Sequence, residues 1–183
     1  ATRHRFAEAA ADPHVVGVKL LRNHGHQLAA TAGLAVCRGE RVLLIDADLQ
    51  DPPELITDMA ALMDQGADVV YGKRRSREGE TRFKIATAAL FYRLLAKLTD
   101  VKIPLDTGDF RLMNRRIVDA LNSMRERQRF LRGMVCWIGG QQVPLEYERK
   151  SRFVSSTKYP LGKIILFALD AFTSFSIQPL RLA

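Results

Sequence analysis

The chain has 183 residues, 47% of them hydrophobic, which suits one globular domain with a buried core. Its formal net charge is +8, and basic residues cluster within 73–84, within 111–132 and from Arg149 onward. Such clusters attract phosphates, nucleic acids or anionic membranes, although a solvated basic face accounts more simply for any single one. No signal peptide is visible, and no apolar run reaches the ~20 residues that span a bilayer. Cys37 and Cys136 lack the spacing of metal ligands, which predicts buried thiols in a reducing compartment.

Strand and helix patterns alternate along the first 72 residues, which predicts an α/β fold with a mostly parallel sheet flanked by helices. The expected elements are a strand at 14–21, a helix at 25–37, a buried strand at 41–46, a helix up to about Gln65 and a strand at 67–72. Asp51 is expected to cap the second helix, with Pro52 at its first position and Glu54 at its third. Gly66 is expected to end that helix.

The regular alternation stops after Gly72, and repeats or low-complexity segments are not seen. The elements expected there are a polar loop at 73–82, a helix at about 83–98, a turn entering a strand at 106–114, short helices around 114–124 and 129–138, an edge strand at 141–150, a loop at 151–160 and an apolar helix at 161–175.

Two aspartates one residue apart, Asp46 and Asp48, end the apolar run at 41–46. In open α/β sheets, ligands bind beyond the carboxyl ends of the strands. Carboxylates this close repel one another and lose hydration unless a positive charge compensates. Oxygen ligands suit Mg²⁺ or Mn²⁺, which commonly combine one or two carboxylates with substrate phosphates. Gln50 offers a further carbonyl oxygen, so the segment predicts a metal–phosphate site.

A calcium loop and a helix cap are the two alternatives to a metal–phosphate site in this segment. A calcium loop that starts at Asp46 would need Gly at its sixth position and Glu at its twelfth. The chain has Asp51 and Thr57 there, which excludes a calcium loop. Helix capping is expected of Asp51, which leaves the two earlier aspartates without a capping role.

Three segments together resemble the family 2 inverting glycosyltransferases: "RNHGHQLAATAGL" (22–34), "DADLQDPPE" (46–54) and "DTGDFRLMNRR" (106–116). The resemblance covers essentially the whole chain and is closest to the branch that uses polyprenyl phosphates. That branch includes dolichol-phosphate mannose synthases and bacterial undecaprenyl-phosphate sugar transferases. The resemblance implies a GT-A fold with a Rossmann-like sheet. It also implies that Asp46, Asp48 and Gln50 hold Mg²⁺ or Mn²⁺ against the diphosphate of a nucleotide-sugar.

The resemblance extends to the catalytic and phosphate-binding positions. Asp109 matches the catalytic carboxylate, whereas its neighbour Asp106 fits a tight turn with Gly108 better than catalysis. Arg127 and its neighbours Arg129 and Arg132 fit either lipid headgroups or a solvated helix end. The residues expected near the donor or acceptor phosphates are Lys73, Arg74, Arg152, Lys158 and Tyr159. The last three lie in "RFVSSTKY", which resembles the branch's mobile acceptor loop but lacks its usual glycine.

The implied reaction is the attack of a lipid phosphate oxygen on the anomeric carbon of a UDP- or GDP-sugar, with inversion. A phosphomonoester is mostly dianionic at neutral pH because its second pKa is near ~6, so it scarcely needs a general base. Asp109 is therefore expected to orient the acceptor or the sugar as much as to take a proton. The identity of the sugar stays open.

The implied place of action is the cytoplasmic face of the inner (plasma) membrane. The apolar segment 161–177 is too short to span a bilayer, and with its flanking basic residues it fits a helix lying on a membrane surface about as well as a core helix. The lipid phosphate that the resemblance implies as acceptor favours the membrane surface. The expected division is a catalytic domain at 1–150, followed by an acceptor loop and a juxtamembrane helix at 151–183. We expect the chain to be a fragment that lacks the family's first nucleotide-binding strand and a later transmembrane region, through which a homo-oligomer would form.

Two rival functions stay open at this point. A non-catalytic basic module that binds membranes or nucleic acid would explain the charge but not the paired aspartates, and the enzyme hypothesis expects no nucleic-acid partner. A glycosyltransferase of the same fold with a non-lipid acceptor, such as a polysaccharide synthase, would carry a Gln-x-x-Arg-Trp-like motif. The segment "ERQRFLRGM" (126–134) resembles that motif only weakly.

Overall fold

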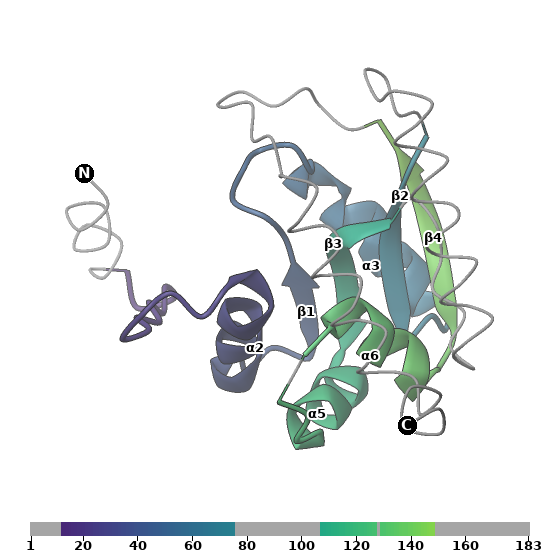
Figure 1. The fold of residues 1–183 in the computed structure, drawn as a ribbon. Helices are drawn as coiled ribbons and strands as arrows, with labels where there is room; N and C mark the ends of the chain where they lie inside the picture. The colour runs from purple at the N-terminus through teal and green to yellow at the C-terminus, as the bar shows by residue number, and fades with distance from the viewer. Residues whose placement is uncertain (1–11, 76–106, 128, 149–183) are drawn as a thin grey trace, which may run out of the picture. The chain divides into compact units, whose positions relative to one another are not determined.

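The structure, a computed structural model, describes residues 12–75, 107–127 and 129–148 (Figure 1). The chain divides after Cys37 into two compact units, 1–37 and 38–183. The predicted helices at 83–98 and 161–175, the loop at 151–160 and the predicted domain boundary at 150 lie outside the described residues. Within the described part of the chain, no helix has the length and hydropathy needed to cross a membrane.

The described part of the first unit holds an irregular segment and one helix. The strand predicted at 14–21 is wrong, because residues 15–20 have no regular secondary structure. The three valines of this segment are exposed. Helix α2 (His26–Val36) confirms the helix predicted at 25–37. Just before this helix, the Asn23 Oδ1 accepts a hydrogen bond at 2.8 Å from the N–H of Gly25, the N-cap residue.

A mixed four-stranded sheet forms the centre of the described part of the second unit. Its order is β1-β3-β2-β4, with β1 (Arg41–Leu44), β2 (Val69–Arg74), β3 (Thr107–Asn114) and β4 (Gln142–Tyr147). β3 runs antiparallel to β1 and β2, whereas β4 pairs with β2 in parallel at the sheet edge, as predicted. β1, β2 and β4 therefore point the same way, and the start of β3 lies at their carboxyl ends. The predicted α/β class with flanking helices is confirmed, whereas the described sheet is mixed instead of mostly parallel, because β3 pairs antiparallel with both of its neighbours.

One face of the sheet packs against α3 (Ile56–Asp64), which Figure 1 shows behind the strands. Val70 of β2 and Leu112 of β3 are paired directly across the two strands, so their side chains lie on the same face of the sheet. They join Met59 and Met63 of α3 in one buried cluster. Gly66 follows the helix in the left-handed region, with φ of 103°, which confirms its predicted role as the residue that ends it.

The predicted cap at Asp51 is wrong. A short 3-10 helix, η1 (Pro53–Leu55), precedes α3; its N-cap is Pro52, and no side chain caps it. Pro53 has no N–H to donate, which removes one of the two backbone donors, at the second and third helical positions, that a capping side chain at Asp51 would use. Asp51 is instead buried and accepts a hydrogen bond from the hydroxyl of Tyr147 on β4.

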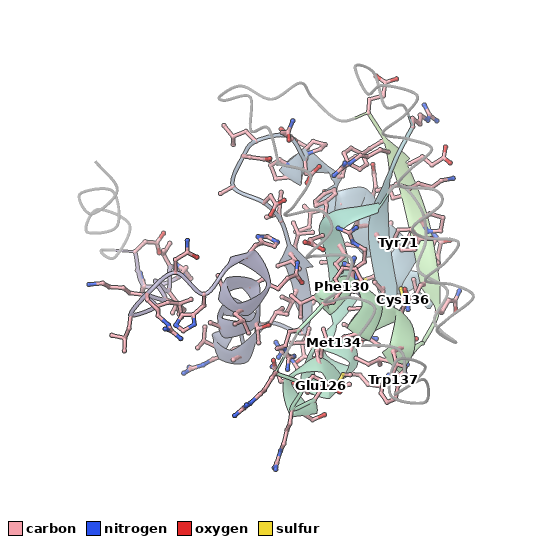
Figure 2. The ribbon with its side chains drawn as sticks, viewed as in Figure 1. Tyr71, Glu126, Phe130, Met134, Cys136 and Trp137 are labelled. Carbon is pink, nitrogen blue, oxygen red and sulfur yellow. The ribbon has the colours of Figure 1, made fainter. Side chains whose placement is uncertain are left out.

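The opposite face of the sheet packs against α6 (Leu131–Ile138), which lies in front of the strands in Figure 1. Its neighbour α5 (Arg115–Ser123) starts directly after β3, where the Asn114 Oδ1 accepts a hydrogen bond from the Ile117 N–H at 3.0 Å. Figure 2 shows Cys136 of α6 beside Tyr71 of β2. Burial raises the pKa of the thiol and of the phenol there. Both side chains therefore stay neutral at physiological pH.

Candidate active site

Several of the residues that the sequence predicts to be catalytic, metal-binding or phosphate-binding lie at one edge of the sheet. Asp46 and Asp48 follow β1, Arg74 ends β2 and Asp109 lies near the start of β3; Tyr147, which the sequence analysis did not predict as a site residue, ends β4. The antiparallel direction of β3 brings its first residues to the carboxyl ends of the other three strands. This edge is where ligands bind in open α/β sheets. The structure thus places the paired aspartates, the predicted catalytic carboxylate and one predicted phosphate-binding arginine on the same edge.

The strand register locates Asp46 relative to Asp109. The ladder between β1 and β3 ends where Leu44 pairs with Arg111. Asp46 lies two residues after Leu44 in the chain, and Asp109 lies two residues before Arg111. Because the two strands are antiparallel, both residues lie beyond the same end of the ladder. The register therefore directs the chain that leaves β1 toward the position of Asp109.

The acidic loop, residues 46–51, leaves β1 through an unusual backbone conformation. Leu49 has φ of 60°, the only positive φ outside glycine among the described residues. The left-handed region costs an L-residue roughly 1–2 kcal/mol, and such strain is concentrated at ligand-binding sites and active sites. The Asp48 Oδ1 accepts a hydrogen bond from the Gln50 N–H at 3.1 Å, which supports the bend. The loop exposes the Leu49 side chain and buries that of Gln50.

The donor set of the acidic loop fits a hard divalent cation. Asp46, Asp48 and Gln50 offer carboxylate and amide oxygens, which are the ligands that Mg²⁺ and Mn²⁺ take. In the described ranges, three or more His, Cys, Asp or Glu side chains do not gather into a metal-binding group. A pair of carboxylates is nevertheless what Mg²⁺ commonly uses, because it retains water and binds substrate phosphates as its other ligands.

Asp109 forms an ion pair with Arg132 on α6. The distance from Arg132 Nη2 to Asp109 Oδ1 is 3.3 Å, and the two side chains are 19% and 11% exposed. The prediction that Arg132 meets lipid headgroups or solvent is therefore wrong, because its guanidinium reaches inward to β3. Arg129 is also occupied within the fold: its two terminal nitrogens each donate at 2.6 Å to the carbonyls of Leu121 and Met124 at the end of α5.

Arg111 adds a second guanidinium beside Asp109, and this one is fully buried. It lies two residues further along β3, is only 3% exposed, and donates from Nη2 to the Gly108 carbonyl at 3.1 Å. Burial lowers the pKa of Arg111 to about 10; the charge of Arg132 lowers it further and that of Asp109 opposes the shift. The guanidinium therefore stays charged at neutral pH. Among the described residues, the two positively charged guanidinium groups of Arg111 and Arg132 therefore lie beside the single carboxylate of Asp109. This excess of positive charge favours the binding of a further anion nearby.

Sequence reasoning missed Arg111, although the sequence carried a signal for it. In "DFRLM" an arginine interrupts an otherwise apolar run that was predicted to be a strand. An arginine in a buried strand needs charged or carbonyl partners, since an unpaired buried charge is costly. Its position two residues after Asp109 also places both side chains on the same face of β3.

Gly108 permits the close approach of Arg74 to β3. A Cβ atom at position 108 would lie 2.9 Å from Arg74 Nη2, so any larger residue would displace this guanidinium. The structure thus places Arg74 against Gly108, the residue directly before Asp109.

Lys73, the other predicted phosphate-binding residue at the end of β2, is paired with a carboxylate. Its Nζ lies 2.9 Å from Glu146 Oε1 on β4, and this hydrogen bond is the main cause of the lowered pKa of Glu146. Asp106, Arg152, Lys158 and Tyr159 lie outside the described residues.

Comparison with known proteins matches this chain to one family. The sequence model described as glycosyl transferase family 2 matches residues 2–121. The chain is 49% identical to the uncharacterized glycosyltransferase YkcC of Bacillus subtilis, over 94% of the chain and 53% of that protein. It is 41% identical to the prophage bactoprenol glucosyl transferase homolog of Escherichia coli K12, over 96% of the chain and 58% of that protein. Identity is also 41% to the bactoprenol glucosyl transferase of Shigella phage SfV, over 96% and 57%. The chain spans just over half the length of these relatives.

Proposed function

Because the chain belongs to glycosyl transferase family 2, we propose that the protein transfers a sugar from a nucleotide-diphosphate sugar to a polyprenyl phosphate, with inversion at the anomeric carbon. The observation that carries the proposal is the shared sheet edge of the acidic loop and Asp109, where the buried guanidinium of Arg111 and the partly buried one of Arg132 accompany the Asp109 carboxylate. The names of the bactoprenol glucosyl transferases support a polyprenyl acceptor.

The acidic loop is the proposed site for the donor's diphosphate. Asp46, Asp48 and Gln50 would hold Mg²⁺ or Mn²⁺ there, because their oxygens suit such a cation. A bound cation supplies Lewis-acid chemistry that neutralises charge on the departing nucleoside diphosphate. Arg74 would add a positive charge from the end of β2, next to Gly108. The proposed donors are UDP- and GDP-sugars.

Asp109 is the proposed catalytic residue. A polyprenyl phosphate is mostly dianionic at neutral pH and needs little help to lose a proton. An ionised Asp109 would repel it, but Arg111 and Arg132 offset this repulsion because their charges lie beside the same carboxylate. An ionised carboxylate only accepts hydrogen bonds, so Asp109 suits a sugar hydroxyl or the last acceptor proton. Its proposed task is therefore to orient the reactants as much as to remove a proton.

The proposed place of action is the cytoplasmic face of the inner membrane. A nucleotide-sugar donor is soluble in the cytoplasm, whereas the acceptor phosphate lies at the membrane surface. The six basic residues from Arg149 onward, against the single acidic residue Asp170, would favour an anionic leaflet by about 1 kcal/mol for each one near the surface.

Calorimetry on the full-length protein tests the donor site. UDP and GDP are titrated with Mn²⁺ and again with a chelator, and we expect one of them to bind at least about tenfold more tightly with the metal. Asp48→Asn should remove this metal dependence, whereas Asp58→Asn, an exposed aspartate in the first turn of α3, should retain it. Equal binding with metal and with chelator would contradict the proposed donor site.

A further inference from the structure

Tyr147 occupies a junction between three strands and the acidic loop. It is 5% exposed at the end of β4, where it pairs with Arg74 of β2. Its ring packs edge-on against Phe110 of β3, with centroids 5.6 Å apart and ring planes at 66°. Gly72 provides the space for both rings, because a Cβ there would lie 2.6 Å from Phe110 Cδ1 and 2.8 Å from Tyr147 Cε1.

The hydroxyl of Tyr147 reaches the last residue of the acidic loop. It donates a hydrogen bond to the Oδ1 of Asp51, 96 residues earlier in the chain, and Asp51 is only 2% exposed. Burial, together with the nearby Asp51 carboxylate, raises the pKa of Tyr147 to about 12, so the phenol keeps its proton and remains a donor. Removing one partner of a buried hydrogen bond typically costs about 1–3 kcal/mol, because the other partner is left without water.

We propose that Tyr147 is a positioning residue that fixes the acidic loop to the sheet and thereby sets the direction in which Asp46, Asp48 and Gln50 present their oxygens. The geometry supports this because the contact holds the residue next to Gln50, at the end of a loop whose backbone is already strained at Leu49. The consequence for metal and diphosphate rests on the proposed function, whereas the anchoring of the loop does not.

Hydrogen exchange on the full-length protein tests the anchoring. Tyr147→Phe keeps the ring and removes only the hydroxyl, so we expect amides in residues 46–51 to exchange about tenfold faster. Tyr71→Phe removes a partly buried hydroxyl from β2 on the same sheet and is the matched control, which should leave this loop unchanged. Unchanged exchange of the loop in a folded Tyr147→Phe protein would overturn the inference.

A second pair of variants separates anchoring from general destabilisation. Asp51→Asn keeps an oxygen acceptor for the Tyr147 hydroxyl and should retain loop protection, whereas Asp51→Ala should lose it. Faster exchange in both variants alike, or in neither, would overturn the inference, because the hydrogen bond would then not be what protects the loop.

Mn²⁺ binding measured together with UDP or GDP tests the consequence at the site. Supporting contacts of this kind typically contribute about 10- to 100-fold in metal affinity, so Tyr147→Phe should weaken Mn²⁺ binding about tenfold. Tyr71→Phe should bind as wild type does. If wild type binds Mn²⁺ and Tyr147→Phe binds it equally well, the inferred consequence is wrong. If wild type itself shows no metal-dependent nucleotide binding, the proposed function fails while the exchange result still decides the anchoring.

Discussion

Arg132 Nη2 lies 3.3 Å from Asp109 Oδ1, and this pair joins helix α6 to the strand that carries the proposed catalytic carboxylate. Both side chains are mostly buried, so solvent screens their interaction less than it would at the surface. Arg132 therefore restricts where the Asp109 carboxylate points, and its charge favours the ionised form of that group.

Asp109→Asn should abolish transfer and preserve nucleotide binding. The amide retains the size of the side chain but removes the charge and the second acceptor oxygen, so we expect the transfer rate to fall by about 10²-fold or more. Asp119→Asn is the control, because Asp119 is exposed on α5, where it forms an ion pair with Arg115 of the same helix. Turnover and calorimetry on the same preparations measure the two effects. Loss of nucleotide binding in Asp109→Asn would place this residue in the donor site instead.

Arg132→Gln should lower turnover more than it weakens donor binding. Without the guanidinium the Asp109 carboxylate loses an orienting partner, and small misplacements of catalytic groups cost about 10- to 100-fold in rate. Breaking a mostly buried ion pair should also lower the free energy of unfolding by about 1–3 kcal/mol. Arg132→Lys keeps the charge and should recover part of the rate.

Arg127→Gln is the matched control for this variant, because Arg127 lies exposed in the connection between α5 and α6. We expect its kcat and its KM for the nucleotide-sugar to equal those of wild type. An Arg132→Gln protein with unchanged kcat would show that the ion pair has only a structural role.

The local parts of this fold were predictable from the sequence. The apolar run at 41–46, the glycine that ends α3 and the alternation at 141–150 each led to an element within a few residues of its observed bounds. These signals are short-range, since periodicity and capping depend on residues a few positions apart. The segment 14–21 shows the limit of such reasoning, because an apolar run forms a strand only where a partner strand pairs with it.

The contacts that complete the candidate site were not predictable in this way. The Asp109–Arg132 pair spans 23 residues, and the Asp51–Tyr147 hydrogen bond spans 96. Such pairings depend on how α6 and β4 return to the sheet, which no local pattern records. Asp51 illustrates this, because its sequence context fits a helix cap, yet its carboxylate accepts a hydrogen bond from a tyrosine on the distant strand β4.

Gly72→Ala should destabilise the second unit. The added Cβ would meet the packed rings of Phe110 and Tyr147, and overpacking of this kind costs about 1–3 kcal/mol in the free energy of unfolding. Gly108→Ala is the informative comparison: its Cβ would meet the Arg74 guanidinium, the movable end of a flexible side chain, so we expect a smaller loss. Urea denaturation of both variants measures the difference. Equal stability of Gly72→Ala and wild type would contradict the packing described around Tyr147.

The stability of the fold should depend on the ionisation of Asp68. Its carboxylate accepts hydrogen bonds from the Gln141 N–H, the Asn114 amide and the Arg116 guanidinium, at 2.9, 2.7 and 2.7 Å. The Gln141 hydrogen bond is the main cause that lowers the pKa of Asp68 below its ordinary value of 3.8. A lowered folded-state pKa stabilises the protein above the unfolded-state pKa, and this stabilisation disappears as pH falls through the folded value.

Asp68→Asn should therefore flatten the decline of unfolding free energy on acidification from about pH 5 to about pH 3. Urea titrations at several pH values measure that slope for wild type and variant. Identical slopes would show that Asp68 titrates alike in the folded and unfolded chains, contrary to its observed hydrogen bonds.

The central claim is transfer of a sugar to a polyprenyl phosphate, and one assay tests it most directly. Membranes that contain the full-length protein are incubated with undecaprenyl phosphate and, in turn, with radiolabelled UDP-glucose, UDP-N-acetylglucosamine and GDP-mannose. We predict that one donor labels a lipid extractable into organic solvent, that the label requires undecaprenyl phosphate, and that Asp109→Asn abolishes it. Label that appears only in water-soluble products would contradict the account.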